Sequence, residues 1–240
     1  MLSDDKDITA LNNSRFVISP PDISTLPVSS TSKLFPINRV FCIGRNYAAH
    51  AIEMGHNPDK EPPFFFQKSP VNVTFGEDFP YPPKSQDVHF EFELVAALKS
   101  GGTNIPVDKA LDCVYGYGLG FDMTRRDLQG EAKKLGRPWD VGKAFEKSAP
   151  CGKIYPVTEI GHPSEGAVTL DVNNIRKQTG DLNQMIWKTS EMIAILSEYF
   201  ELRAGDLIMT GTPSGVGPCL RGDILHGVIE GVGELTVTVR

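Results

Sequence analysis

The chain has 240 residues, of which 40% are hydrophobic and 22% are charged, and its formal net charge is −6. This is the composition of an ordinary globular protein that buries a sizeable core, and the scattered basic residues exclude the basic face that DNA or RNA binding requires. No apolar run reaches the length of a membrane span, and the acidic start MLSDDKDITALNNS lacks the charge pattern of a signal or transit peptide. We therefore expect a cytoplasmic protein without a nucleic-acid or membrane partner.

Residues 1–36 differ in composition from the rest of the chain. Ser, Asn and Pro are common in FVISPPDISTLPVSSTSKLFP and little periodicity is present, which predicts an extended N-terminal arm on the surface. Residues 37–240 then form one main domain. It begins with the strand-like RVFCIG and with NYAAHAIEMG, whose composition favours a helix that stops at Gly55. The next stretch, EPPFFFQKSPVNV, is apolar and bounded by prolines.

Strands are predicted over residues 89–99 and 113–121, and the clearest helix is predicted over residues 181–200, DLNQMIWKTSEMIAILSEYF. The apolar residues of this segment follow the three-and-four spacing of a helix that packs against a sheet, and Asp181 is available to cap its start. After it, DLIMTGTPSGVG and DILHGVIEGVGELTVTV predict short strands separated by glycine-containing turns. The patterns together indicate an α/β protein of one domain.

Two glutamates interrupt the apolar pattern of the strand predicted over residues 89–99. In HFEFELVAALKSGG, Glu91 and Glu93 are two residues apart, so their side chains lie on one face of the strand while Phe90, Phe92 and Leu94 lie on the other. Carboxylates this close repel and raise each other's pKa unless a cation lies between them. A solvated edge strand is the alternative interpretation, and a third ligand is needed to indicate a metal site.

The strand predicted over residues 113–121 offers this third ligand. Its glycines do not fit a nucleotide-binding loop, because no Lys-Ser or Lys-Thr pair follows them. They instead allow close backbone approach in a packed strand that ends on Asp122. Three hard oxygen ligands, Glu91, Glu93 and Asp122, favour Mg²⁺, or Mn²⁺ and Ca²⁺, over zinc. The four cysteines form no CxxC pair, so neither a zinc site nor a disulfide framework is indicated.

Six ordered motifs are shared with a known family: GRNYAAH, FFFQKSP, FEFELV, GFDMTRRDLQ, RPWDVGKAFE and GDLIMTGTPSGVG. Through them the chain resembles the fumarylacetoacetate hydrolase family, and within it the short, single-domain acylpyruvate hydrolases. The resemblance implies the family's mixed, β-rich α/β fold for residues 37–240, in which a β-roll surrounds the site and helices lie at the periphery. It also implies a homodimer.

The resemblance assigns roles to the candidate catalytic and metal-binding residues. It implies a metal site with Mg²⁺ as the usual ion, held by Glu91, Glu93 and Asp122. His50 and Glu53 match the family's water-activating pair, and because they lie three residues apart on a helix they share a face, so the carboxylate can orient the imidazole. Lys143 in DVGKAFE matches an active-site lysine, whose ammonium can stabilise an oxyanion.

The substrate-binding positions of the family match Arg126, Gln129 and Thr212. Arg126 and Gln129 follow Asp122 on a polar segment, and Thr212 lies in the glycine-rich TGTPSG, where a ligand can approach the backbone. Arg45 in GRNY is a further candidate for holding a carboxylate. The sequence leaves open whether Arg125 or Arg126 faces the site.

These residues suit the hydrolysis of a 2,4-dioxo acid, with an acylpyruvate of aromatic catabolism, fumarylpyruvate, as the expected substrate. A metal polarises the diketone, His50 takes a proton from the attacking water, and Lys143 and Gln129 stabilise the oxyanion. Cleavage of the C3–C4 bond then releases pyruvate and a carboxylic acid. No organic cofactor is needed.

Two other classes of function stay open at this point. The same site would serve decarboxylation of oxaloacetate, or a decarboxylase or isomerase step on a related 2-oxo acid, and His50 with Glu53 favours hydrolysis over these. A non-catalytic binding module is the least favoured reading, because the metal, base and lysine candidates are all present.

Overall fold

The computed structural model describes residues 16–53, 62–76 and 78–240. In these residues an eight-stranded sheet has the order β4-β3-β15-β8-β9-β11-β5, with β12 beside β9. Its strands are β3 (Arg39–Gly44), β4 (Phe64–Lys68), β5 (Val73–Phe75), β8 (Phe92–Leu98), β9 (Val114–Phe121), β11 (Ala149–Cys151), β12 (Tyr155–Pro156) and β15 (Asp206–Met209). β8 runs antiparallel to both β9 and β15 at the middle of this sheet.

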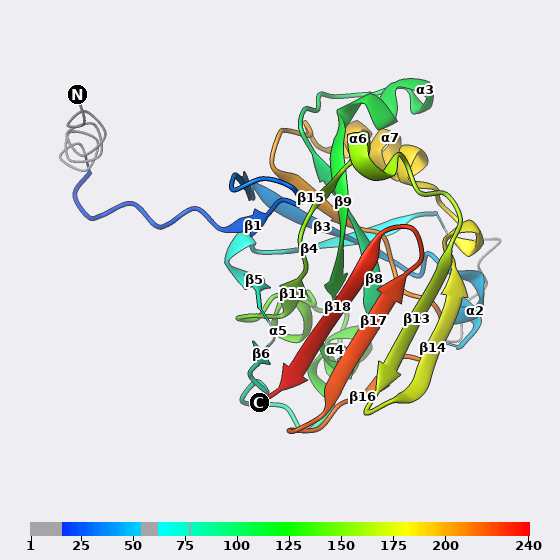
Figure 1. Ribbon diagram of the computed structural model, residues 1–240. Helices are drawn as coiled ribbons and strands as arrows, with labels where there is room; N and C mark the ends of the chain where they lie inside the picture. Colours follow the sequence, from blue (N-terminus) through cyan, green and yellow to red (C-terminus); the bar gives the residue numbers. More distant parts are fainter. Residues whose placement is uncertain (1–15, 54–61, 77) are drawn as a thin grey trace.

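Three smaller sheets surround the large one. The five-stranded sheet β14-β13-β17-β18-β6 comprises β6 (Asp78–Phe79), β13 (Ala167–Val172), β14 (Ile175–Asp181), β17 (Ile224–Ile229) and β18 (Gly233–Val239). The sheet β10-β7-β16 comprises β7 (Val88–Phe90), β10 (Thr124–Arg125) and β16 (Gly217–Pro218), and β1 (Thr25–Pro27) pairs with β2 (Leu34–Pro36). Figure 1 shows β14, β13, β17 and β18 side by side in front of β8 and β9.

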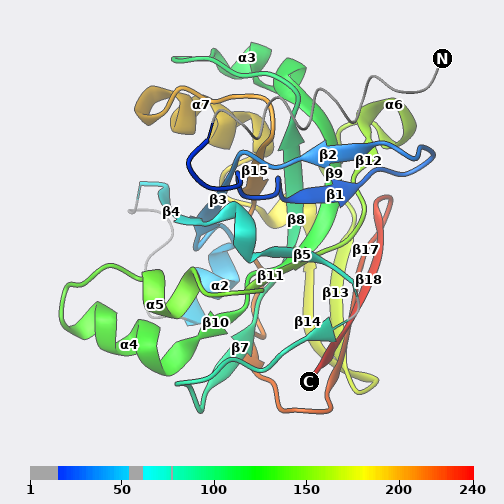
Figure 2. The same ribbon diagram turned by 90° about the vertical axis from the view of Figure 1, so that its left-hand side faces the viewer.

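The helices are short and peripheral, as the family resemblance implies. They are α2 (Ala48–Glu53), α3 (Val107–Ala110), α4 (Arg126–Lys134), α5 (Asp140–Lys143), α6 (Val157–Ile160) and α7 (Thr189–Tyr199), with 3₁₀ turns η1 (Pro70–Asn72), η2 (Leu111–Cys113) and η3 (Leu182–Gln184). In Figure 2, α4 and α5 lie on the opposite side of the molecule from β17 and β18. Among the described residues, none of these helices has the length and apolarity of a membrane span. The predicted mixed, β-rich α/β fold is confirmed.

Two apolar cores lie on the two faces of β8. Leu94, Ala96 and Leu98 belong to the core shared with the five-stranded sheet, and Val95 and Ala97 belong to the other core. This alternation is the period of two that a strand buried on both faces requires. The second core also contains the buried residues Leu26 of β1 and Phe35 of β2, so β1 and β2 cover the large sheet. All four cysteines are buried and unpaired.

The strand predicted over residues 89–99 is interrupted at Glu91. β7 pairs with β10 and β16, whereas β8 pairs with β9 and β15, so the chain passes from one sheet to another at this glutamate. The prediction of one continuous strand was wrong, because a change of sheet depends on pairing partners that lie far away in the sequence. The break leaves Glu91 between the two sheets rather than inside a ladder.

The helix predicted over residues 181–200 begins later, at Thr189. Asp181 ends β14, and its carboxylate accepts a hydrogen bond from the Asn183 N–H at 2.9 Å, which caps η3 instead of a long helix. Asn46 binds the following segment in extended form, because its backbone carbonyl accepts from the Ile186 N–H at 2.7 Å and its side-chain carbonyl from the Trp187 N–H at 2.7 Å. Tertiary hydrogen bonds therefore override the local helical pattern over residues 182–188.

The glycines of β9 allow a close backbone approach, as predicted. A Cβ atom at Gly116 would lie 2.3 Å from the Tyr155 carbonyl oxygen, and one at Gly118 would lie 2.8 Å from the Lys153 carbonyl oxygen. Only glycine permits residues 153–155 to lie this close to the strand. Asp122 follows directly after the last residue of β9, which is the predicted position at a strand end.

Two glycine substitutions test this packing. A Cβ atom at Gly227 of β17 would lie 2.4 Å from the Phe92 ring, so we expect Gly227→Ala to lower the free energy of unfolding by about 1–3 kcal/mol, the usual cost of overpacking. A Cβ atom at Gly130 of α4 would meet no described atom within 4 Å, so Gly130→Ala serves as the control and raises stability by about 0.5–1 kcal/mol. Urea unfolding measures both, and equal effects of the two substitutions would contradict the packing.

Candidate metal centre and active site

Three buried carboxylates form the centre of the candidate site. Glu91, Glu93 and Asp122 each offer an oxygen, and these oxygens lie within 4.8 Å of one another. Glu93 pairs with Gly120 across β8 and β9, and the Asp122 N–H donates to the Glu91 carbonyl oxygen at 2.8 Å. The strand register therefore brings together the three acids that the sequence predicted as metal ligands.

The charges of this cluster require a cation. Burial, followed by the charges of Asp122 and Glu91, raises the pKa of Glu93 well above its ordinary value. Asp122 Oδ1 is buried and accepts no well-aligned hydrogen bond from the described residues, although the Lys68 ammonium lies 2.9 Å away. Three carboxylates this close together fit a hard divalent cation, which would hold all three acids ionised.

Lys143 and Arg126 contact the carboxylates from α5 and α4. The Lys143 ammonium donates to Glu91 at 3.0 Å and to Asp122 at 2.7 Å, and the Arg126 guanidinium donates to Glu91 at 2.5 Å. Burial alone would lower the pKa of Lys143, but the carboxylates of Asp122 and Glu91 outweigh it and raise that pKa above its ordinary value. Lys143 is therefore placed as a hydrogen-bond donor to both carboxylates.

The question of which arginine faces the site is answered by these contacts. Arg126 reaches Glu91, and its second guanidinium nitrogen donates to the Gln129 side-chain oxygen at 2.7 Å. Arg125 instead lies over the Phe145 ring, 4.3 Å from its centre, and donates to the Val141 carbonyl. Arg126 and Gln129 are thus brought together at the carboxylates, and Arg125 is not.

Lys68 is a site residue that the sequence reasoning missed. Its side chain is fully buried at the end of β4, with the ammonium 2.9 Å from Asp122 Oδ1. The same ammonium donates to the backbone carbonyls of Met123 and Lys143 and to the Ser148 hydroxyl. Lys68 therefore joins the end of β9 to the end of α5 and holds Asp122 and Lys143 in place. A lysine at the end of the apolar run FFFQK was the available signal.

Hydrogen bonds join the glycine-rich loop after β15 to the start of β8, where Glu93 lies. The Gly211 N–H donates to Glu93 at 2.8 Å, and the Thr212 hydroxyl donates to the Phe92 carbonyl at 2.9 Å. Gln178 of β14, fully buried, donates to the Thr212 hydroxyl at 2.8 Å and to the Pro213 carbonyl. In this structure the Thr212 side chain holds the loop through these hydrogen bonds. Gln178 also holds the loop, and the sequence did not indicate this residue.

Helix α2 lies beside this loop. The Glu53 carboxylate accepts a hydrogen bond from the Gly215 N–H, at 3.2 Å to Oε2. His50 is in the middle of α2, and its side chain lies outside the described part of the structure, as does Gly55, the predicted end of this helix. The roles predicted for His50 and Glu53 stay predictions.

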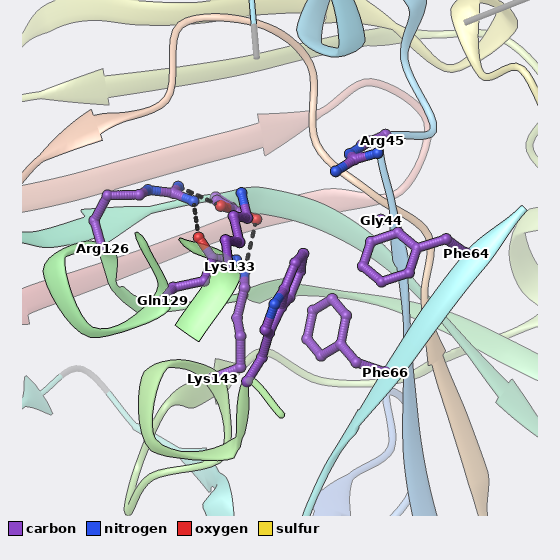
Figure 3. Close-up of a pocket in the computed structure, with 10 residues that line it drawn as sticks. Gly44, Arg45, Phe64, Phe66, Arg126, Gln129, Lys133 and Lys143 are labelled. Atoms are coloured by element: carbon purple, nitrogen blue, oxygen red, sulfur yellow. Dashed lines mark hydrogen bonds and ion pairs between the residues drawn. The ribbon is translucent and has the colours of Figure 1, made fainter. Parts of the chain in front are cut away.

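A pocket opens beside the carboxylates between α4 and β4. Figure 3 shows Arg126, Gln129, Lys133 and Lys143 on one wall, with Gly44, Arg45, Phe64 and Phe66 on the opposite wall. Glu91 and Trp139 complete the lining. Arg45 has a left-handed backbone conformation with φ of 60°, which is uncommon for a non-glycine residue, and its guanidinium lies 5.4 Å from the centre of the Phe64 ring.

Removing the Lys68 charge tests its structural role. In Lys68→Met the buried Asp122 loses a cation, so we expect the free energy of unfolding without metal to fall by about 3–5 kcal/mol. Urea unfolding measures the loss, and Lys153→Met, which alters an exposed lysine, is the matched control. An effect of Lys68→Met no larger than that of the control would show that the ion pair does not hold the site.

Comparisons with known proteins find similar sequences and similar structures. The fumarylpyruvate hydrolase of Ralstonia sp is 44% identical over 189 residues, which are 78% of this chain and 98% of that protein. The oxaloacetate tautomerase YcgM of Escherichia coli (strain K12) is 36% identical over 198 residues, covering 82% of this chain and 90% of that protein. The crystal structure of fumarylpyruvate hydrolase from Pseudomonas aeruginosa, in complex with Mn²⁺ and pyruvate, superposes with a TM-score of 0.92 at 46% identity, covering 93% of this chain and 98% of that one.

A family model, fumarylacetoacetate (FAA) hydrolase C-terminal, matches residues 39–240. This range contains all the strands of the large sheet and every candidate site residue. The family that the six sequence motifs indicated is thereby confirmed: the chain belongs to the fumarylacetoacetate hydrolase family.

Proposed function

We propose that this protein is a Mg²⁺-dependent hydrolase that cleaves the C3–C4 bond of a 2,4-dioxo acid, with fumarylpyruvate as its substrate. The observation that carries the proposal is the buried three-carboxylate centre with Lys143 and Arg126 on its rim. Support for the substrate comes from the similar fumarylpyruvate hydrolases, one of which holds Mn²⁺ and pyruvate. Pyruvate is the product that cleavage of fumarylpyruvate would release.

Glu91, Glu93 and Asp122 would hold the divalent cation. Bound there, it supplies Lewis acidity toward the oxygens of a 2-oxo acid. Mg²⁺ is the ion we propose, because three carboxylates without His or Cys suit a hard cation. With Lys68, Lys143 and Arg126 already matching the charge of the three acids, a divalent ion would give the site a positive excess that attracts an anionic substrate.

His50 is the proposed base. It would take a proton from the water that attacks the C4 carbonyl, and Glu53, three residues later on α2, would orient the imidazole and stabilise its protonated form. The hydrogen bond from Gly215 supports this role, because it fixes the Glu53 carboxylate against the loop that also holds Glu93.

Lys143 and Gln129 are the proposed donors to the oxygen that becomes negative when water adds to C4. The raised pKa of Lys143 keeps its ammonium charged, so it stabilises that oxygen without giving up a proton beforehand. Arg126 holds Gln129 in orientation through their 2.7 Å hydrogen bond. Collapse of the tetrahedral intermediate breaks the C3–C4 bond, and protonation of the departing C3 carbon yields pyruvate beside fumarate.

Oxaloacetate tautomerisation is the second candidate function, favoured by the oxaloacetate tautomerases among the relatives. Tautomerisation moves a proton at C3 and needs no attack by water. Tautomerisation leaves the C3–C4 bond intact and hydrolysis breaks it, so the release of pyruvate and a second carboxylic acid distinguishes the two reactions. The decarboxylase alternative, the homodimer and the cytoplasmic location stay predictions.

Metal binding gives the first test. Isothermal titration of chelator-treated protein with Mg²⁺ is expected to show one site per chain. Loss of a hydrogen-bond partner of a metal ligand costs about 10- to 100-fold in metal affinity. Loss of a ligand itself costs more, so Glu93→Gln is expected to weaken the Mg²⁺ affinity by more than about 100-fold. Since the pKa of Glu93 is raised, a proton competes with the ion and the affinity falls as the pH is lowered. Glu131→Gln on the exposed face of α4 is the control; retained affinity in Glu93→Gln would exclude the proposed ligand set.

Turnover gives the second test. Loss of the ultraviolet enol absorbance of fumarylpyruvate and acetylpyruvate is followed with and without Mg²⁺, and oxaloacetate is assayed beside them. We expect cleavage only with the metal, and a fall in kcat of about 10²- to 10⁴-fold in His50→Ala, the usual contribution of a general base. Turnover of oxaloacetate alone, with no pyruvate and carboxylic acid released from either dioxo acid, would replace hydrolysis by the second candidate function.

A further inference from the structure

Lys133 is a cation of the pocket that the proposed reaction does not use. It lies on α4 at the third position of a series, Arg126, Gln129 and Lys133, whose spacing of three and four places all three side chains on one face of the helix. All three line the pocket. The series therefore forms a polar stripe that begins at the metal ligand Glu91, where Arg126 binds, and runs away from it.

The far end of this stripe lacks a negative partner. Lys133 is half-buried, with its ammonium 4.9 Å from the centre of the Trp139 ring, and among the described residues no carboxylate forms an ion pair with it. Burial, followed by the charges of Arg126 and Arg45, lowers its pKa to about 8. A half-buried cation that lies among other cations, and that forms no ion pair with a carboxylate of the described residues, is a site at which an anionic group would be stabilised.

The middle of the pocket is aromatic. The Trp139 ring packs edge-on against Phe64, with ring centres 5.0 Å apart, and its centre lies 5.8 Å from that of Phe66. These rings line the same pocket as Glu91 and Lys133 and suit a flat, unsaturated carbon chain. The pocket thus combines a carboxylate, aromatic walls and the Lys133 cation.

We propose that Lys133 binds the second carboxylate of a dicarboxylic acylpyruvate, the one at the acyl end of the substrate, and so sets specificity for an acyl group that ends in a carboxylate. The inference rests on the proposed function. Seven residues of α4 separate Arg126 from Lys133, a rise of about 10 Å, and the extended seven-carbon chain of fumarylpyruvate spans about 7 Å between its carboxylates. The long, flexible lysine side chain covers the difference.

The test compares a dicarboxylate with a monocarboxylate. Fumarylpyruvate and acetylpyruvate share the reacting atoms, and only the former has the second carboxylate. In Lys133→Met we expect KM for fumarylpyruvate to rise about 10- to 100-fold, the value of one charge-assisted hydrogen bond, with kcat/KM for acetylpyruvate unchanged. Lys133→Arg should restore the preference, and Lys134→Met, the exposed neighbour on α4, should leave it intact.

The pH dependence adds a second measurement. Charged groups around Lys133 are Arg126, Arg45, Glu91 and Lys143. The Lys133 ammonium is charged below its pKa of about 8, so the ratio of kcat/KM for fumarylpyruvate over acetylpyruvate should fall as the pH rises from about 7 to about 9 in the wild type. In Lys133→Arg the ratio should stay constant, because the guanidinium remains charged.

Two outcomes overturn the inference: an equal loss for both substrates in Lys133→Met, or no loss for either. If the wild type cleaves neither substrate, the proposed reaction is wrong, and the subsite is judged by binding alone. Fumarate and crotonate, which differ only in a carboxylate against a methyl group, are then titrated against tryptophan fluorescence in the presence of Mg²⁺. A preference for fumarate that Lys133→Met abolishes supports the subsite, and equal binding of the two acids overturns it.

Discussion

Mutual repulsion of three buried carboxylates is the constraint on which the rest of the site depends. Glu91, Glu93 and Asp122 bring their oxygens within 4.8 Å of one another away from water, an arrangement that is stable only beside compensating positive charge. The chain supplies part of that charge from Lys68, Lys143 and Arg126, the first two of them buried. A divalent ion in the proposed site would add a positive excess, and with it the attraction for an anionic substrate.

Features that lie far apart in the sequence place the carboxylates and their cations together. The break between β7 and β8 places Glu91 between two sheets, and the glycines of β9 let residues 153–155 pack closely on the strand that ends at Asp122. Lys68 then ties that strand end to the end of α5. Because each tie joins different elements, the site is a property of the folded domain and not of any one motif.

Much of this was predictable from the sequence, since hard oxygen ligands at strand positions leave a local pattern. Glu91 and Glu93 stand out by their spacing of two in an apolar segment, and Asp122 follows a strand whose glycines mark close packing. Lys68 left only its position at the end of the apolar run FFFQK and Gln178 left no local pattern, because their roles depend on partners far away in the sequence. The late start of α7 has the same cause, the hydrogen bonds of Asn46. The β13–β14 hairpin, in contrast, had a local signal in Asn173 and Asn174, both with left-handed φ.

In the proposed hydrolysis, water adds to the C4 carbonyl of a dioxo acid bound in the pocket. Turnover of fumarylpyruvate in water enriched in ¹⁸O tests this most directly, with mass spectrometry of the fumarate released. One ¹⁸O atom per molecule of fumarate, formed together with one pyruvate, is the predicted result. Release of unlabelled fumarate would contradict the attack of water on C4. Loss of the substrate enol without release of fumarate and pyruvate would also contradict it and leave only proton transfer at C3.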